Sequence, residues 1–183
     1  MTDFKQDHPD GVVVALDEMS LYLQATSQRV WFRRGQRPVL PLSPQRDCLH
    51  WYGALALLSG QEVALSVPTL DSQMTVHFLT HLLTVFPVQP ILLFLDRAPW
   101  HRGPAIEAFL AEHSRLQVHY FPPACPHLNP QEHVWKAARQ AVSHNHSFLS
   151  LGALRHAFAH FLDRTLFHFQ WLDKFLPPIL CHV

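Results

Sequence analysis

Three acidic residues, Asp17, Asp96 and Glu132, lie where neighbouring elements can bring carboxylates together. Asp17 follows the apolar run 12–16, and Asp96 follows the apolar run Ile91–Leu95, both of which are typical of buried strands. Glu132 lies in the first turn of a predicted helix. Because the carboxyl ends of strands converge at one edge of an α/β sheet, we expect the three carboxylates to meet there.

Such a cluster of carboxylates repels itself unless cations occupy it. Mg²⁺ suits it, because this hard ion accepts a few carboxylates together with water and phosphate oxygens. Two ions about 3.5–4 Å apart can activate a water or hydroxyl nucleophile and stabilise the leaving oxygen of a phosphodiester. The pattern therefore predicts metal-dependent chemistry on phosphodiesters.

Each carboxylate also has a purely structural interpretation. The run Asn-Pro-Gln-Glu at 129–132 is a well-formed helix start, with Asn as the cap and Glu in a capping box. Asp96 is equally suited to a turn before Pro99, and Asp17 beside Glu18 to an ordinary strand end. Spacing alone leaves both interpretations open.

The order of predicted elements places these residues on one mixed α/β sheet with helices on its faces. Strands are predicted at 12–16, 21–24, 48–58, 62–67, 91–95 and 116–121, and residues 30–32 are a further candidate to pair beside them. Helices are predicted from a cap at Asp71 to just before Pro87, and at 103–113, 129–143 and 151–168. Hairpin-linked strands come first and helix-linked strands second, so antiparallel strands precede parallel crossover strands. We assign residues 1–10 to a leader, 11–168 to the domain and 169–183 to a tail.

The composition excludes several classes of protein. With 183 residues, 48% of them hydrophobic and 15% charged, the chain is long and apolar enough for one compact domain. Its formal net charge of zero argues against a self-sufficient basic DNA-binding module. Cys48, Cys125 and Cys181 form no disulfide or metal pattern, so a reducing, cytoplasmic location is expected. The start of the chain is no signal peptide, and prolines, histidines and a glutamine interrupt the apolar stretch 76–95, so no membrane span is expected.

The short sequence segments around the three carboxylates resemble the motifs of DDE transposases of the mariner-like superfamily, in its bacterial insertion-sequence branch. Residues 95–101, Leu-Asp-Arg-Ala-Pro-Trp-His, resemble the second-aspartate motif. Residues 121–136, Phe-Pro-Pro-Ala-Cys-Pro-His-Leu-Asn-Pro-Gln-Glu-His-Val-Trp-Lys, are similar to the third motif, a Pro-rich loop followed by Asn-Pro-x-Glu-x-x-Trp. Asp17 and Glu18 match the first motif, and residues 31–38 and 52–55 are similar to the hairpin region. The 35 residues between Asp96 and Glu132 are close to the family spacing.

This resemblance implies an RNase H-like fold with a mixed five-stranded sheet. It implies that Asp17, Asp96 and Glu132 bind two Mg²⁺ or Mn²⁺ ions and catalyse hydrolysis at transposon ends. The freed 3′-hydroxyl would then attack target DNA. DNA and a second copy of the chain are the implied partners. His101 matches a family position beside the site, where it would contact DNA or orient Asp96; the alternative is a satisfied polar residue at a helix start.

Two departures from the family pattern matter. Arg97 replaces the usual Asn after the second aspartate, where it could pair with Asp96, compete with metal or bind phosphate. The family also carries N-terminal helix-turn-helix domains, whereas the first catalytic strand here begins after about ten residues. We therefore expect either a separate chain that carries DNA recognition or a truncated remnant.

The basic residues Arg29, Arg33, Arg34 and Arg37 are the candidate phosphate contacts, with a solvated hairpin as the alternative. Two histidine pairs suggest a zinc site, one at 156 and 160 and the other at 144 and 146. Neither pair has a third ligand, and the sequence contains no HExxH motif.

Two other functions remain open. One is a catalytically silent remnant that only folds and dimerises, and the other is a structure-selective nuclease that does not join strands.

Overall fold

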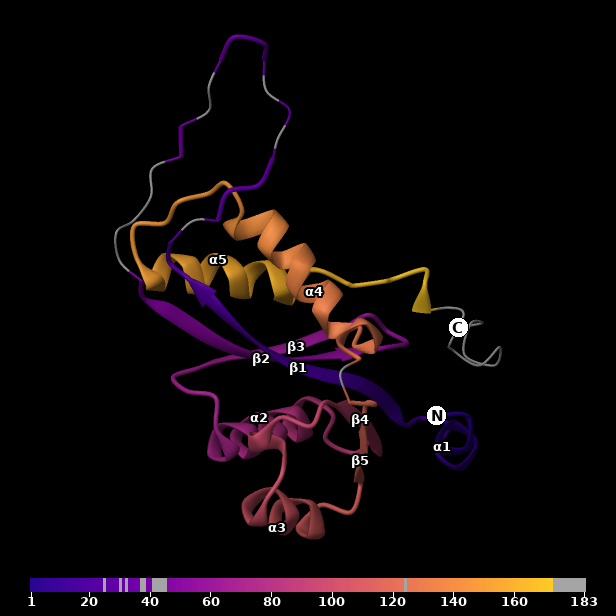
Figure 1. The fold of residues 1–183 in the computed structure, drawn as a ribbon. Helices are drawn as coiled ribbons and strands as arrows, with labels where there is room; N and C mark the ends of the chain where they lie inside the picture. The colour runs from indigo at the N-terminus through magenta and orange to yellow at the C-terminus, as the bar shows by residue number, and fades with distance from the viewer. Residues whose placement is uncertain are drawn as a thin grey trace.

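A computed structural model describes residues 1–24, 26–29, 31, 33–36, 39–40, 46–123 and 125–172. Its centre is a sheet of five strands in the order β3-β2-β1-β4-β5 (Figure 1). The strands are β1 Val12–Tyr22, β2 Cys48–Ala56, β3 Glu62–Val67, β4 Ile91–Leu95 and β5 Leu116–Tyr120. β1, β2 and β3 pair antiparallel, whereas β4 runs parallel to both β1 and β5. The predicted mixed sheet, with antiparallel strands first, is confirmed.

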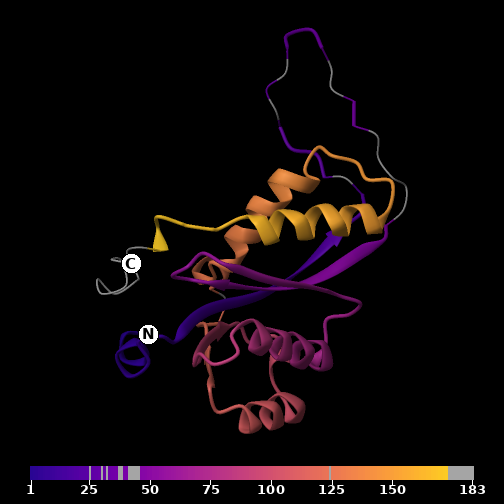
Figure 2. The ribbon, with the colours of Figure 1, turned by 180° about the vertical axis from the view of Figure 1, so that it is seen from behind.

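Helices cover both faces of this sheet. They are α1 Thr2–Asp7, α2 Ser72–Val85, α3 Pro104–Glu112, α4 Gln131–Ala138 and α5 Leu151–Arg164, and a π-helical turn at Arg139–Ser143 extends α4. α2 and α3 lie on one face, and α4 and α5 lie on the other (Figures 1 and 2). No helix in the described ranges is both long and apolar enough to cross a membrane.

One strand prediction is wrong in an informative way. β1 does not end at Asp17 but continues to Tyr22, so the separate strand predicted at 21–24 does not exist. β2 pairs with β1 along its whole length, from Val14 opposite Ala56 to Tyr22 opposite Cys48. This continuous ladder outweighs the local signal of two adjacent acidic residues. Asp17 and Glu18 therefore point to opposite faces of one strand.

Other differences are smaller. α5 ends at Arg164 rather than at residue 168, and the Phe167 N–H then donates to the Gly60 carbonyl, which keeps the chain extended along the sheet. Residues assigned to a leader form α1, and Phe4 is buried against Val13 and Leu92. Of the candidate strand 30–32, residues 30 and 32 lie outside the described residues.

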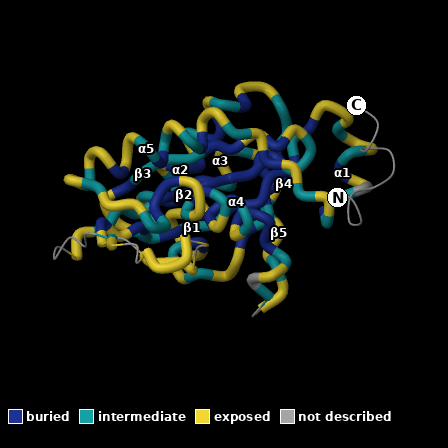
Figure 3. Tube along the Cα trace, turned by 90° about the horizontal axis from the view of Figure 1, so that it is seen from above, coloured by how far each residue is buried: buried dark blue, intermediate teal, exposed yellow. Residues whose placement is uncertain are grey.

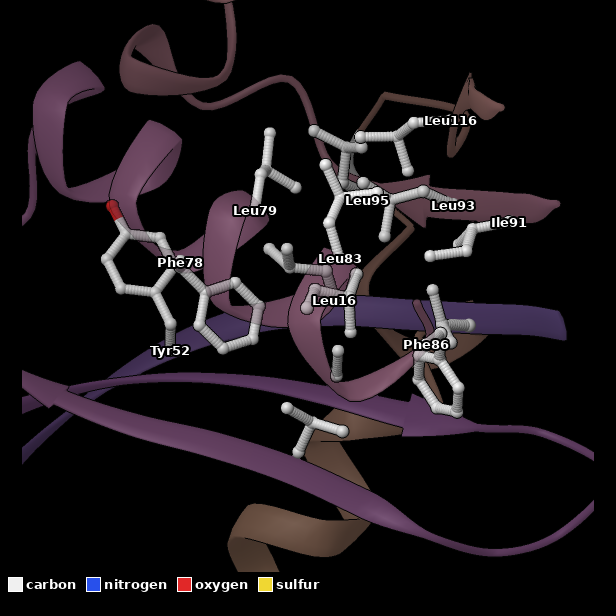
Figure 4. Packing of buried hydrophobic residues seen from close by; sticks show 14 of the residues in the cluster. Leu16, Tyr52, Phe78, Leu79, Leu83, Phe86, Ile91, Leu93, Leu95 and Leu116 are labelled. Carbon is white, nitrogen blue, oxygen red and sulfur yellow. The ribbon is translucent and has the colours of Figure 1, made fainter. Parts of the chain in front are cut away.

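The two larger hydrophobic clusters of the described residues, one on each face, hold these layers together. On the first face, Phe78, Leu79 and Leu83 of α2 pack against apolar side chains of β1 and β4 (Figure 4). On the second, Trp135 of α4 and Phe158 of α5 pack over β1 and β2. Buried residues follow the strands, while exposed ones lie on loops and outer helix faces (Figure 3). Each large buried side chain contributes roughly 1.5–3 kcal/mol, so burial on both faces fixes the sheet between the helices.

Gly53 of β2 is a point where α4 packs directly against the sheet. It faces Asp17 in the β1–β2 ladder, and a Cβ atom added there would overlap Trp135 and Gln131 of α4 and Glu62 of β3. A glycine is therefore required if α4 is to pack this closely on β2.

We expect Gly53→Ala to lower the free energy of unfolding by about 1–3 kcal/mol, because it overpacks this contact. Urea denaturation of the purified chain measures the effect. The matched control is Gly152→Ala on α5, where the nearest atom to an added Cβ is Ser150 Oγ at 3.8 Å. A Gly53→Ala variant as stable as its control would contradict the close approach.

Candidate active site

Asp17, Asp96 and Glu132 line one open pocket of about 380 Å³. They come from three elements: the middle of β1, the residue after β4 and the first turn of α4. The other lining residues are Arg97, Ala98, Phe121, Pro122, Pro123, Cys125 and Asn129. The pocket thus brings together the three carboxylates that the sequence singled out.

The parallel pairing of β1 with β4 places the two aspartates at the same level. Its last paired residues are Ala15 and Phe94. Asp17 and Asp96 each lie two residues beyond them. The pocket therefore forms at the carboxyl end of β4, beside a strand that runs on past it.

Asn129 fixes the start of α4 against β1. Its buried side chain donates a 3.0 Å hydrogen bond from Nδ2 to the Leu16 carbonyl and accepts one of 3.1 Å from the Gln131 N–H. The helix cap is Pro130, and within the described ranges Glu132 makes no side-chain bond back to Asn129, so the expected capping box does not form. Glu132 is instead exposed in the pocket, one residue after a buried anchor.

The carboxylates interact electrostatically across the pocket. Burial, together with the charges of Glu132, Glu18 and Asp96, raises the pKa of Asp17 to about 8. Within the part of the chain that the structure describes, no three His, Cys, Asp or Glu side chains lie close enough together to hold a metal ion as they stand. The arrangement is an open set of oxygen ligands, which a divalent cation would stabilise because it neutralises their mutual repulsion.

His101 supports Asp96 from the opposite face of the sheet. It is completely buried; Nδ1 lies 2.8 Å from Asp96 Oδ1, and Nε2 lies 2.6 Å from Glu18 Oε1. The Tyr120 hydroxyl donates to its backbone carbonyl at 3.0 Å. Both ring nitrogens can donate only when the imidazole is protonated. The geometry is that of an imidazolium held between two carboxylates.

The pKa values agree with this geometry. Burial by itself lowers the pKa of His101, but the hydrogen bonds and charges of Asp96 and Glu18 outweigh it and raise the pKa to about 9. The bond from His101 also lowers the pKa of Asp96. The complete burial of His101 argues against the predicted DNA contact, and its bond to Asp96 favours the orienting role. Glu18 was missed as a site residue, although its place after Asp17 in a strand is the signal for a second carboxylate on the other face.

Arg97 does not pair with Asp96. Its guanidinium lies over the Tyr120 ring, 5.9 Å from the ring centroid, and among the described residues it forms no ion pair. It lines the pocket and remains exposed. It is therefore available to a phosphate.

The predicted DNA-contacting arginines lie elsewhere. Arg29, Arg33 and Arg34 are exposed on the segment between β1 and β2, and none of the three lines the pocket. Arg37 lies outside the described residues.

Two basic residues that sequence reasoning missed are Lys136 and Arg139, which follow Glu132 at helical spacing. Neither forms an ion pair with a described residue. Arg139 lines a second pocket, of about 210 Å³, together with Tyr22 and His144. The spacing i, i+4, i+7 from Glu132 is the signal that could have identified them.

The zinc interpretation finds no support among the described residues. The rings of His156 and His160 on α5 lie 6.4 Å apart, and no third ligand accompanies them.

Comparison with known proteins supports the same family. A family model described as "DDE superfamily endonuclease" matches residues 12–155. An uncharacterised 39 kDa protein of insertion element IS630 from Shigella sonnei is 24% identical over 158 residues, which are 86% of this chain and 45% of that protein. This chain therefore spans about half the length of its curated relative.

Solved structures show the same fold. The Mos1 transposase paired-end complex with left transposon end aligns over 90% of this chain and 51% of that chain, with a TM-score of 0.65 and 15% identity. The Mos1 mariner paired-end complex with Mn aligns over 84% of this chain and 48% of that chain, with a TM-score of 0.61 and 16% identity. The expected RNase H-like fold, a mixed five-stranded sheet flanked by helices, is confirmed.

Proposed function

This chain belongs to the DDE superfamily endonucleases, and we propose that it is the metal-dependent catalytic domain of a DNA transposase. It cleaves phosphodiester bonds at transposon ends and joins the freed 3′-hydroxyl to target DNA. The observation that carries the proposal is the single pocket lined by Asp17, Asp96 and Glu132.

These three carboxylates fit Mg²⁺ or Mn²⁺. They are oxygen ligands from separate elements, and their mutual repulsion, seen in the raised pKa of Asp17, is what a bound cation relieves. When bound, two such ions supply Lewis-acid activation of the nucleophile and stabilisation of the leaving oxygen. One of the related structures is itself described as a complex with Mn.

Residues of the chain hold this ligand set in place. His101 and Glu18 fix Asp96 from behind, and Asn129 fixes the start of α4 beside Asp17. Side chains that orient metal ligands in this way typically change metal affinity or activity by about 10–100-fold when they are replaced. The protein contributes orientation, and the open side of the pocket admits the DNA strand.

The DNA backbone follows the exposed face of α4. Lys136 of α4 and Arg139, the first residue of the π-helical turn that extends it, lie about 6 and about 10.5 Å from Glu132 along the helix axis, at a rise of roughly 1.5 Å per residue. Arg97 supplies a bidentate donor at the pocket itself. Arg29, Arg33 and Arg34 provide a second exposed basic surface on the segment between β1 and β2, and Arg37, outside the described residues, stays a predicted phosphate contact.

Replacing Lys136 and Arg139 together by Ala should flatten the salt dependence of DNA binding by about two units of slope, because two phosphate contacts are lost. Fluorescence anisotropy with a labelled duplex, measured across a salt series, gives the slope. Arg155→Ala with Arg164→Ala, two exposed changes of equal charge on α5, should leave it unchanged. Equal slopes in both double variants would remove Lys136 and Arg139 from the interface.

A product assay tests the proposed function itself. The chain is incubated with Mn²⁺ or Mg²⁺, a pre-nicked transposon-end duplex and a target plasmid, and cleaved and joined products are separated on a gel. Metal-dependent joining supports the transposase. Cleavage without joining identifies the structure-selective nuclease instead, and an unreactive chain that still dimerises identifies the silent remnant. The chain spans about half the length of its curated relative. The assay is therefore repeated with a helix-turn-helix partner chain, which tests the proposed partner. A repeat over a range of protein concentrations tests the proposed homodimer.

A further inference from the structure

A buried polar pair, Glu62 of β3 and Gln131 of α4, lies between the sheet and the first turn of α4. Glu62 keeps 8% of its surface exposed, and Gln131 keeps none. Gln131 Nε2 donates a 2.6 Å hydrogen bond to Glu62 Oε1. The other two oxygens of the pair, Glu62 Oε2 and Gln131 Oε1, are buried and have no hydrogen-bond partner in the described structure. Buried polar atoms are nearly always hydrogen-bonded, so one further donor is required here.

An ionised Glu62 does not meet this requirement. A carboxylate oxygen and an amide oxygen both only accept, so the two unpartnered oxygens cannot satisfy each other. No ion pair with Glu62 is formed by any described cation. A proton on Glu62 Oε2 would resolve the conflict, since it turns that oxygen from an acceptor into a donor, and Gln131 Oε1 is the unpartnered acceptor of the same pair. Burial also raises the pKa of Glu62 well above its ordinary value, and the bond from Gln131 only partly opposes this shift.

The pair lies directly behind the active-site pocket. Gln131 immediately precedes Glu132, and both members of the pair occupy the space that a side chain at position 53 would fill. Gly53 in turn faces Asp17 in the β1–β2 ladder. Asn129 ties the start of α4 to β1, and Gln131 ties it to β3. The two side chains together define the position of the first turn.

We propose that Glu62 is a neutral carboxylic acid in the folded protein, and that its pair with Gln131 is a positioning element that sets where Glu132 enters the pocket. The positioning role rests on the function proposed above, whereas the protonation state does not.

Infrared spectroscopy at neutral pH tests the protonation state. The difference spectrum between the chain and its Glu62→Gln variant should contain the C=O stretching band of one protonated carboxyl group. Asp17 contributes to both spectra and cancels. A difference spectrum that shows only carboxylate bands would overturn the neutral acid.

Cleavage kinetics test the positioning role with two designs. In Glu62→Gln, the new amide can both accept from Gln131 and donate to it without a proton, so turnover should stay within about threefold of that of the parent chain. In the double variant Glu62→Leu with Gln131→Leu, apolar groups replace both partners, so unfolding stability should be largely retained. Its turnover should fall about 10–100-fold at unchanged DNA affinity, because Glu132 is misplaced. Full turnover in the double variant would reduce the pair to simple packing.

A crystal structure of the double variant distinguishes a failure of the positioning role from a failure of the proposed function. If the parent chain cleaves no DNA under any condition, the proposed function fails, but the position of Glu132 relative to Asp17 can still be compared. A displaced first turn of α4 then supports the positioning role, and an unmoved one overturns it.

Discussion

Replacing Asp96 by Asn or Glu132 by Gln will abolish metal-dependent DNA cleavage while the fold remains intact. Each change removes one charged oxygen ligand at nearly constant size. Divalent ions contribute several kcal/mol to phosphoryl transfer, and about 1.4 kcal/mol corresponds to a tenfold change in rate, so a loss on the order of a thousandfold is expected. Single-turnover cleavage of a pre-nicked end duplex measures it.

The matched control for this experiment is Glu107→Gln, an equal change at an exposed position of α3 outside the pocket. It should cleave at the parent rate. Thermal unfolding should leave Glu132→Gln and Glu107→Gln close to the parent chain, because both side chains are exposed. Asp96→Asn will lose part of its bond with His101, so a slightly lower Tm is expected there. Retained cutting in either pocket variant would refute the role of that residue.

Asp17→Asn should also abolish cleavage, yet it should make the metal-free protein more stable at neutral pH. Burial and the neighbouring carboxylates raise the pKa of Asp17 from 3.8 to about 8. Between these values the native state binds more protons than the unfolded state does, so the free energy of unfolding falls as the pH rises. Asn carries no charge and escapes this penalty. The expected gain at pH 7 is on the order of a few kcal/mol.

Urea denaturation between about pH 4 and pH 8 checks this prediction. The stability difference between Asp17→Asn and the parent chain should be small near pH 4 and should grow as the pH rises. Mn²⁺ should stabilise the parent chain and have much less effect on the variant, because ligand binding to the native state raises its stability. Asp163→Asn, at an exposed position on α5, serves as the control. Parallel pH curves for the parent chain and Asp17→Asn would show that Asp17 ionises normally.

Local sequence signals were sufficient for most elements of the fold. The wholly apolar run at 91–95 predicted β4 with its observed bounds, and Asp71 was identified as the cap of α2, where it accepts from the Met74 N–H at 2.9 Å. The sequence motifs around Asp17, Asp96 and Glu132 identified these three residues, which line the pocket. Apolar periodicity, caps and turns act over a few residues, so they can be interpreted without a tertiary structure.

Interactions between distant segments could not be predicted in this way. β1 runs through Asp17 because β2, far along the chain, pairs with it, and Glu18 reaches His101 across 83 positions. The Glu62–Gln131 pair spans 69 positions and has no local signature.

By itself, then, the sequence determined the type of sheet, its main elements and the identity of three pocket carboxylates. The tertiary structure alone decided that His101 is a buried support for Asp96, that Arg97 stays free of it, and that burial and neighbouring carboxylates raise the pKa of Asp17. The physical reason is that burial and charge–charge interactions depend on which atoms surround a group in space. Side-chain type and local spacing do not contain that information.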